Sequence, residues 1–246
     1  MTLSPEVVAE QVMGYVVWAS ELIPTLTPSP KKPYSLVILP QGPHFYTWLL
    51  QAAGYLLLDS QKKKILVISQ QSDDSENILV DTSIFWPVFW QTRETPMTTL
   101  SKIARSIGAK LSTKKSDMLQ ENIRFQLPFL RVITDIKQMI HIGIGDEAPQ
   151  IQLKKLLTWI NKNIQEYNII FLTNIELSKP TQSKKSDEER QISKLVQTYS
   201  LTAPLLTLFQ KVLNVQKKKS EIIAYVNPGD FGKIWVSTTR YVCAVG

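Results

Sequence analysis

Short apolar runs alternate with longer segments of helical periodicity along most of the chain. The first run, residues 35–39, stops at a Pro-Gln-Gly-Pro turn, and a long apolar segment follows at residues 43–58. Similar runs return at residues 65–69, 138–145 and 168–174. Runs of this kind are typical of buried parallel strands, and the segments between them are typical of helices that pack back over the sheet.

Further helices are predicted where apolar residues recur every three or four positions. In residues 4–23, Ser4 can cap the helix and Pro5 suits its first turn. The remaining predicted helices are residues 98–110, 149–164, 186–199 and 203–215. The side chains of helix 149–164 that we expect to face inward are Leu153, Leu157, Ile160 and Ile164.

The other apolar segments predict strands at the edges of the sheet. Residues 78–92 are β-branched and aromatic and include Pro87, which suits edge strands or a strand pair. Residues 126–133, QLPFLRVI, contain Pro128, and we expect a strand end that runs into a short turn. Two terminal strands, near 221–226 and 233–244, are predicted on either side of an Asn-Pro-Gly-Asp turn.

This order of elements predicts an α/β protein. We expect a single three-layer α/β/α domain at residues 35–246, with a mostly parallel central sheet and antiparallel C-terminal strands. Residues 1–34 are predicted to form an N-terminal helix and a proline-rich connector.

The chain of 246 residues has a formal net charge of +7, and its lysines influence which partners we expect. The lysine runs are residues 31–32, 62–64, 114–115, 184–185 and 217–219. Most of these runs lie between predicted elements, without interleaved aromatic residues, which is typical of solvated loops. We therefore do not expect nucleic acid as a partner, although contact with an acidic surface stays open.

Membrane and disulfide chemistry are not expected either. No apolar run reaches the length of about 18 residues that a transmembrane helix needs. The start of the chain also lacks the basic segment that precedes the apolar part of a secretory signal. Cys243 is the single cysteine, so an internal disulfide is excluded and a reducing, cytoplasmic location is predicted.

Candidate chemistry is limited by the supply of side chains. Only two histidines, His44 and His141, could serve a Ser–His–Asp set, and with Cys243 they are few for a zinc or iron site. His141 alternates with isoleucines in a predicted strand and is interpreted as a satisfied core residue. His44 opens a helix just after the first strand, where ligands bind in open α/β sheets.

Several segments, in order, resemble the Memo-like family, which includes protein B of the AmmeMemoRadiSam system. The QLPFL motif at residues 126–130 matches a motif of that family, and residues 37–48 resemble its first strand and loop. The other similar segments are residues 63–74, Thr95-Pro96 and residues 139–160, 168–178 and 222–246. The resemblance implies a fold similar to that of class III extradiol dioxygenases, and a metal held by histidines with a cysteine or acid nearby.

This chain departs from the family at the positions of those ligands. The family's first two histidines fall on Gln41 and Ser72, and its Glu-His-Ser falls on residues 120–122, Gln-Glu-Asn. The later Asp and His fall on Asn174 and about Leu177, and the cysteine falls near Ser200. These residue types do not make a tight site for a transition metal. We therefore expect no metal and no cofactor.

Three functional hypotheses follow. The first is a metal-free, non-catalytic Memo-like domain that binds a small ligand or a protein partner. The second is an enzyme with a rebuilt pocket, in which His44 would be the base near neutral pH. The candidate pocket residues are Gln41, His44, Ser72, Asp73, Asn174, Glu176 and Ser200. The third is self-assembly through an aromatic patch at Trp86, Phe89 and Trp90, for which packing under the sheet edge is the alternative.

Overall fold

The structure is a computed structural model. It describes residues 5–26, 33–41, 44–71, 76–82, 85–88, 91–112, 123, 126–173, 175–176, 204–217, 221–226 and 239–245.

Four parallel strands form the centre of the sheet. They are β1 (Leu36–Leu39), β8 (Tyr167–Leu172), β2 (Lys64–Gln71) and β7 (Gln138–Gly145), side by side in that order. Nearly every residue of these strands is buried, because helices cover both faces of the sheet. This burial explains why the strands are continuous apolar runs in the sequence.

Shorter strands extend the sheet on both sides. Beyond β7 lie β3 (Ile78–Val80), which is antiparallel to β7, and β6 (Lys110–Leu111). Beyond β1 lie β11 (Thr239–Val245) and β10 (Glu221–Val226), both antiparallel to their neighbours. The short β9 (Ile175–Glu176) pairs with β11, so nine described strands share this sheet. A separate hairpin consists of β4 (Phe85–Val88) and β5 (Gln91–Glu94).

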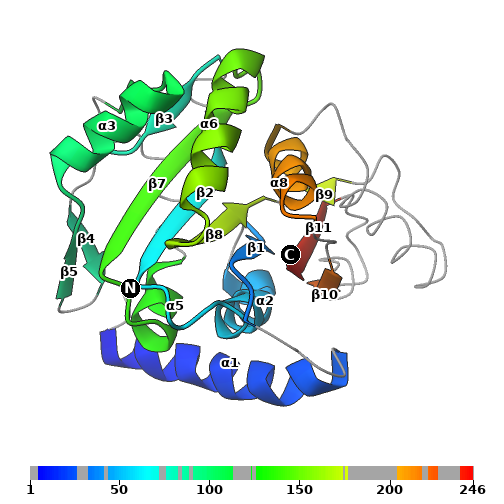
Figure 1. Cartoon of the computed structure of the whole chain (residues 1–246). Coiled ribbons are helices and arrows are strands. Elements are labelled where there is room, and N and C mark those ends of the chain that lie inside the picture. The colour runs from blue at the N-terminus through cyan, green and yellow to red at the C-terminus, as the bar shows by residue number, and fades with distance from the viewer. Residues whose placement is uncertain are drawn as a thin grey trace.

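The helices form layers on the two faces of the sheet (Figure 1). On one face lie α2 (His44–Leu56) and α5 (Leu127–Ile133), with α1 (Pro5–Leu26) packed across both. On the other face lie α3 (Met97–Ile107), α6 (Gln150–Asn163) and α8 (Pro204–Val215). Alternate strand residues supply the two cores: Leu36 and Ile38 face α6 and α8, and Val37 and Leu39 face α2.

The predicted fold class is confirmed: the chain is an α/β protein with helices on both faces of a sheet that is parallel at its centre. The strand pair expected within residues 78–92 is present as β4 and β5, and β3 belongs to the main sheet. The terminal strands are antiparallel to each other, as predicted. The predicted helix 186–199 and the turn at 227–230 lie outside the described residues.

One prediction about local structure is wrong, and another is incomplete. Residues 126–133 were expected to contain a strand end, but residues 127–133 form α5, with Pro128 in its first turn. Proline is tolerated there because the first N–H groups of a helix have no partner within it. Of the four side chains expected to face inward from helix 149–164, Leu153, Ile160 and Ile164 are buried and Leu157 is half-buried against the core. Leu156, which is fully buried, was not predicted. The short strands β6 and β9 were not predicted.

Candidate functional site

The carboxyl ends of β1 and β8 lie together at one edge of the sheet. β1 ends at Leu39 and leads to Gln41, which is half-buried. β8 ends at Leu172, and the next residue, Thr173, is buried. The backbone N–H of Thr173 donates to the carbonyl of Leu39 at 3.1 Å, so the two loops begin from a fixed common point.

The described helices that come next in the chain after these two neighbouring strands lie on opposite faces of the sheet. After β1 the chain enters α2 on one face, and the next described helix after β8 is α8 on the other face. In open α/β sheets, ligands bind outside the carboxyl ends of the strands at a switch point of this kind.

Three of the seven predicted pocket residues are described, and they belong to segments at or next to this edge. Gln41 follows β1, His44 is the first residue of α2, and Glu176 ends β9, opposite Thr239 of β11. The other four, Ser72, Asp73, Asn174 and Ser200, lie outside the described residues, as do Phe89 and Trp90 of the aromatic patch. A common pocket of all seven stays a prediction.

A buried amide stands beside the loop that follows β1. Gln51 of α2 has no exposed surface, and its Nε2 donates to the carbonyl of Pro40 at 3.3 Å. This bond fixes which end of the amide faces the loop. The Oε1 of Gln51 accepts no hydrogen bond in the structure. Six buried side-chain atoms among the described residues share this property, and Oε1 of Gln51 belongs to the amide that is bonded to the loop after β1. A donor group placed beside it would satisfy this acceptor.

A second polar group lies on the α2–α5 face of the sheet. Ser69 of β2 places its Oγ 2.8 Å from Nε2 of His141 on β7, and Nδ1 of His141 is 3.3 Å from Oδ2 of Asp81. Asp81 directly follows β3, and its backbone N–H donates to the carbonyl of His141. We call Ser69, His141 and Asp81 the buried relay. It joins three adjacent strands by side-chain contacts.

With a neutral imidazole and an ionised carboxylate, the contacts of the relay imply one arrangement of its protons. An ionised Asp81 can only accept, so the proton of the imidazole belongs on Nδ1 and is donated to the carboxylate. Nε2 then accepts the hydroxyl hydrogen of Ser69. This is the arrangement that activates a serine for nucleophilic attack. Each of the three side chains is at most 3% exposed, so in this structure the relay is a closed polar group inside the domain.

The sequence analysis identified His141 as a satisfied core residue, and its burial and two contacts confirm this. It did not find the partners, because Ser69 and Asp81 are 72 and 60 residues away in the chain. The available signal was that each of them interrupts an otherwise apolar run or directly follows one.

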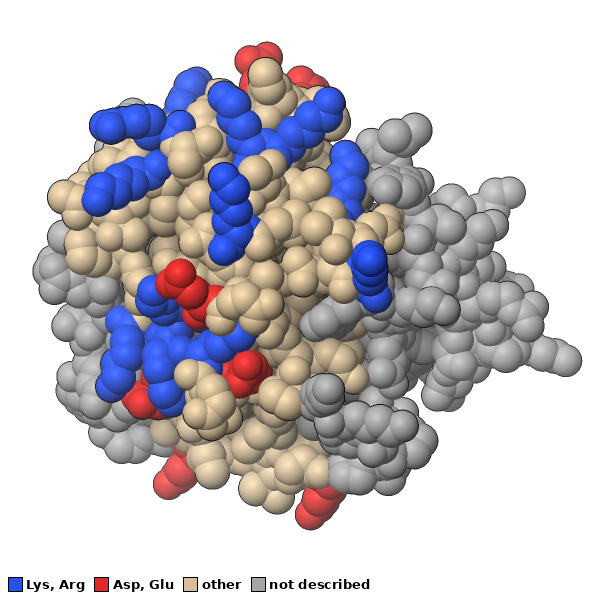
Figure 2. Space-filling model, viewed as in Figure 1, with Lys and Arg blue, Asp and Glu red and all other residues tan. Residues whose placement is uncertain are grey.

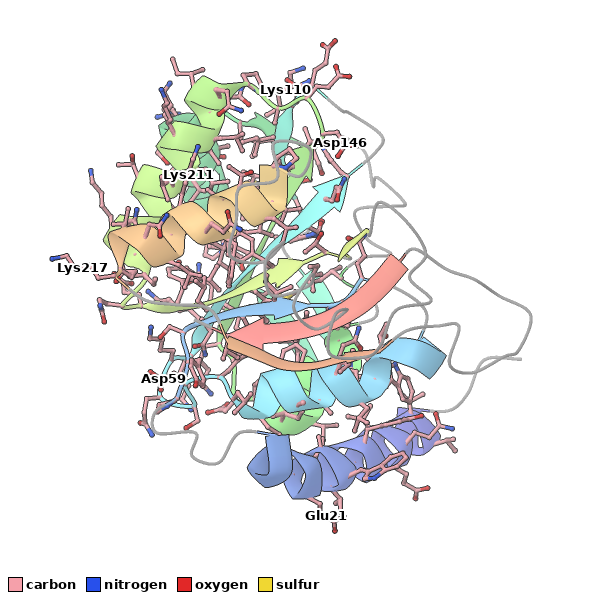
Figure 3. The ribbon with its side chains drawn as sticks, turned by 90° about the vertical axis from the view of Figure 1, so that its right-hand side faces the viewer. Glu21, Asp59, Lys110, Asp146, Lys211 and Lys217 are labelled. Carbon is pink, nitrogen blue, oxygen red and sulfur yellow. The ribbon has the colours of Figure 1, made fainter. Side chains whose placement is uncertain are left out.

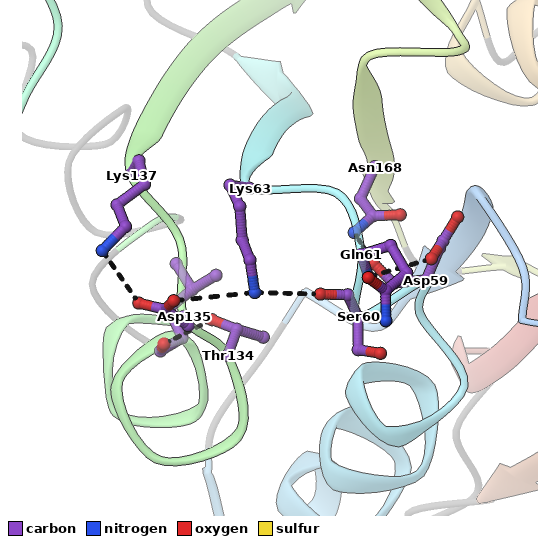
Figure 4. A network of polar contacts seen from close by, with 9 residues as sticks. Asp59, Ser60, Gln61, Lys63, Thr134, Asp135, Lys137 and Asn168 are labelled. Carbon is purple, nitrogen blue, oxygen red and sulfur yellow. Dashed lines mark hydrogen bonds and ion pairs between the residues drawn. The ribbon is translucent and has the colours of Figure 1, made fainter.

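A third polar network lies at the opposite, amino edge of the central strands (Figure 4). Asp135 accepts from Lys137 at 3.3 Å and from Lys63 at 3.6 Å, and all three side chains are largely exposed. The nearby Lys137, and then Lys63, hold the pKa of Asp135 below its usual value. Asn168 donates to the carbonyl of Asp59 at 2.8 Å, which ties β8 to the loop before β2. These contacts join loops to strands.

The lysine run at residues 62–64 also belongs to this edge, and its members are bonded within the protein. Lys62 is half-buried and donates to Ser35 Oγ at 2.7 Å and to the carbonyl of Ile164 at 2.5 Å. Lys64 pairs with Glu166 at 2.6 Å. Lys62 and Lys64 therefore connect neighbouring segments of the chain, and we call their contacts the junction.

Comparison with known proteins gives little direct information about this site. The sequence matches no known family model, and no curated protein is significantly similar to it. Among solved structures, the chain is similar to the uncharacterized protein JW3007 from Escherichia coli K12. The TM-score is 0.49 at 10% sequence identity, over 86% of this chain and 99% of that chain.

The described residues were also considered for metal sites and for membrane-spanning helices. Among the described residues, no group of three or more histidine, cysteine, aspartate or glutamate side chains is placed to hold a metal ion. None of the described helices is long and apolar enough to cross a membrane.

Proposed function

We propose that the protein is a Memo-like binding domain whose ligand sits at the carboxyl edge between β1 and β8. The observation that carries this proposal is the fixed, unsatisfied Oε1 of Gln51 beside a topological switch point. The proposal agrees with the resemblance of the sequence to that family, in which the first loop also contributes to the site.

The chemistry of the edge favours a small polar ligand bound by hydrogen bonds. The residues that follow β1 and β8 here are the half-buried Gln41 and the buried Thr173, both polar and uncharged. Gln51 offers an acceptor that needs a donor, such as an N–H or O–H group. These groups carry no charge, so we propose binding that is metal-free and non-catalytic.

The test is a ligand screen on ¹⁵N-labelled protein with small amides, alcohols and amines. We expect fragments with a donor group to shift the amide signals of Gln41, Thr173 and the start of α2, and to leave those of α3 unchanged. Gln51→Leu should abolish these shifts, and Gln152→Leu is the matched control, because Gln152 lies on α6 across the sheet. Fragments that bind equally well to Gln51→Leu would overturn the proposed site. One equivalent of tightly bound iron, copper or zinc in the purified protein would overturn its metal-free character.

The buried relay favours a second candidate function, an acyl-transfer enzyme in which Ser69 is the nucleophile. His141 would accept the proton of Ser69, and Asp81 would hold the imidazole in the required tautomer. Because Ser69 has no exposed surface, this activity requires the face above it to open. A fluorophosphonate probe tests it: labelling of the wild type that Ser69→Ala abolishes supports the enzyme, and absence of labelling removes it.

A further inference from the structure

The charged residues of the helices on one face of the sheet are all basic. The helices α3, α6 and α8 together contain Lys102, Arg105, Lys154, Lys155, Lys162 and Lys211 and no acidic residue. We call these six cations the basic layer. In contrast, α1 on the opposite side contains three glutamates and no lysine or arginine. Figure 3 shows the separation, with Lys211 and Glu21 on opposite sides of the molecule.

The cations of the basic layer are available to a partner. Five of the six are exposed, and Lys211 is half-buried. None of them takes part in an ion pair among the described residues, whereas Lys63, Lys64 and Lys137 at the amino edge all do. Figure 2 shows basic side chains spread over the upper part of the view, with acidic ones at the rim and beside a second basic group at the centre left. The sequence analysis weighed the lysine runs between elements and so did not consider this layer.

The helices place the cations in two neighbouring rows. α3 and α6 pack against each other, and packed helices have axes about 8–10 Å apart. Lys154 and Lys162 are eight residues apart on α6, which is about 12 Å along the helix axis. Lys155 reaches toward the end of α3, where its Nζ lies 3.6 Å from the place that a Cβ on Gly108 would take. These separations are comparable to the widths of DNA grooves, about 6–12 Å, which separate the phosphate rows of a duplex.

We propose that the basic layer binds the phosphate backbone of a nucleic-acid duplex, without reading its sequence. Lysine acts toward phosphate as a point charge, and five of the six cations are lysines. An anionic membrane is a poorer partner, because each of these helices has only one large apolar side chain among its described residues that is exposed: Met97, Ile151 and Val215. Ile151 and Val215 lie within one helical turn of cations, so the vesicle measurement below is needed to separate the two partners. This inference concerns another face of the molecule and does not rest on the proposed ligand site.

The energetics predict weak, salt-dependent binding. Each neutralised phosphate contributes about −0.9 to the slope of log K against log salt concentration on B-DNA. Contact with four to six phosphates therefore predicts a slope of about −4 to −5. The dissociation constant expected at physiological salt is on the order of 10⁻⁴ to 10⁻⁶ M, as for other non-specific binders.

The experiment measures the fluorescence anisotropy of labelled 20-base-pair DNA and RNA duplexes with the full chain between 50 and 200 mM salt. The test variant is Lys102→Gln/Lys154→Gln/Lys155→Gln. The matched control is Lys63→Gln/Lys64→Gln/Lys137→Gln, which removes the same charge from the amino edge. All six side chains are on the surface, so circular dichroism should show that both variants fold.

We expect the test variant to bind at least tenfold more weakly at 50 mM salt and to lose about 2.7 from the salt slope. The control should change affinity less than threefold. Equal losses in both variants would mean that net charge alone acts, and the proposal would be wrong. The proposal would also be overturned if the wild-type protein bound no duplex. The same holds if the protein bound only phosphatidylserine vesicles or only a second copy of itself.

Discussion

Ser69 and His141 lie two positions out of register on neighbouring parallel strands, and their side chains meet at 2.8 Å on one face of the sheet. His141 pairs with Val67, and Ser69 pairs with Gly143. Gly143 has no side chain, so no side chain of β7 occupies the space directly beside Ser69 on that face. The imidazole therefore bridges from β7 to β2 and, through Asp81, to β3. The contact is a property of strand register, and local sequence does not reveal it.

We predict that Ser69→Ala lowers the free energy of unfolding by about 1 kcal/mol, the net value of a typical hydrogen bond. The change removes the hydroxyl group that donates a hydrogen bond to Nε2 of His141, and it alters the volume of the side chain little. Urea unfolding with an unchanged m-value measures the effect. Ser60→Ala is the control: Ser60 is exposed, so a change within about 0.5 kcal/mol is expected. Equal effects at both serines would show that the relay adds nothing to stability.

Adjacent leucines of α6 give a second prediction. Leu156 has no exposed surface and lies in the core between α6 and the sheet, whereas Leu157 is half-buried at its margin. Leu156→Ala should cost about 2–5 kcal/mol, because it leaves a cavity in a packed core. Leu157→Ala should cost clearly less, since its neighbours can relax into the space. Thermal or urea unfolding measures the two losses of stability. A larger loss for Leu157→Ala than for Leu156→Ala would mean that α6 is rotated by about 100° about its axis.

These two leucines show what the apolar pattern can and cannot establish. The pattern located α6 and its approximate inward face, but two neighbouring apolar positions are only about 100° apart around a helix, and the sheet decides which of them is buried. The same limit explains α5. An apolar segment of seven residues is compatible with either a strand or a helix. Pro128 was interpreted as the end of a strand, but it lies in the first turn of a helix.

The candidate sites were predictable only in part. The edge at Gln41 and His44 follows from the strand–loop–helix pattern, because parallel strands bring their carboxyl ends together. The acceptor of Gln51 depends on how α2 turns toward the loop before it, whereas the buried relay depends on which side chains share a face of the sheet. That required the strand order β1–β8–β2–β7–β3, in which strands far apart in the chain are neighbours.

Two adjacent lysines provide a third prediction, which concerns the amino edge. Lys62 donates to Ser35 and to the backbone carbonyls of Ile164 and Tyr167. Lys62→Met should cost about 1.5–3 kcal/mol, the range for hydrogen bonds to a charged group. Lys63→Met should cost between 0 and about 1 kcal/mol, because its contact with Asp135 is an exposed ion pair. Chemical denaturation of both variants measures the difference, and equal costs would contradict the described junction.

Tyr55 on α2 gives a prediction about pH. Its ring stacks on Phe129 of α5, with the centroids 5.8 Å apart, and its hydroxyl donates to Oε1 of Gln126 at 3.2 Å. Burial raises the pKa of Tyr55 well above its ordinary value of 10.0. The folded state therefore keeps this proton at pH values where the unfolded chain releases it. The contribution of the neutral phenol is fully present below pH 10 and is lost as the pH rises further.

The substitution Tyr55→Phe should reveal this loss, because the difference in unfolding free energy between the variant and the wild type should change with pH. At pH 8 the variant should be less stable by about 1 kcal/mol, because Gln126 loses a donor. Above pH 10 the wild type alone loses about 1.4 kcal/mol per pH unit through this residue, so the difference should close near pH 11. Urea unfolding at pH 8, 9.5 and 11 measures it, and the other tyrosines and the lysines cancel in the comparison. In the control Phe129→Leu, which removes the stacking without changing a titrating group, the difference should be independent of pH. A Tyr55→Phe difference that stays constant up to pH 11 would mean that the phenol ionises as readily in the folded protein as in the unfolded chain.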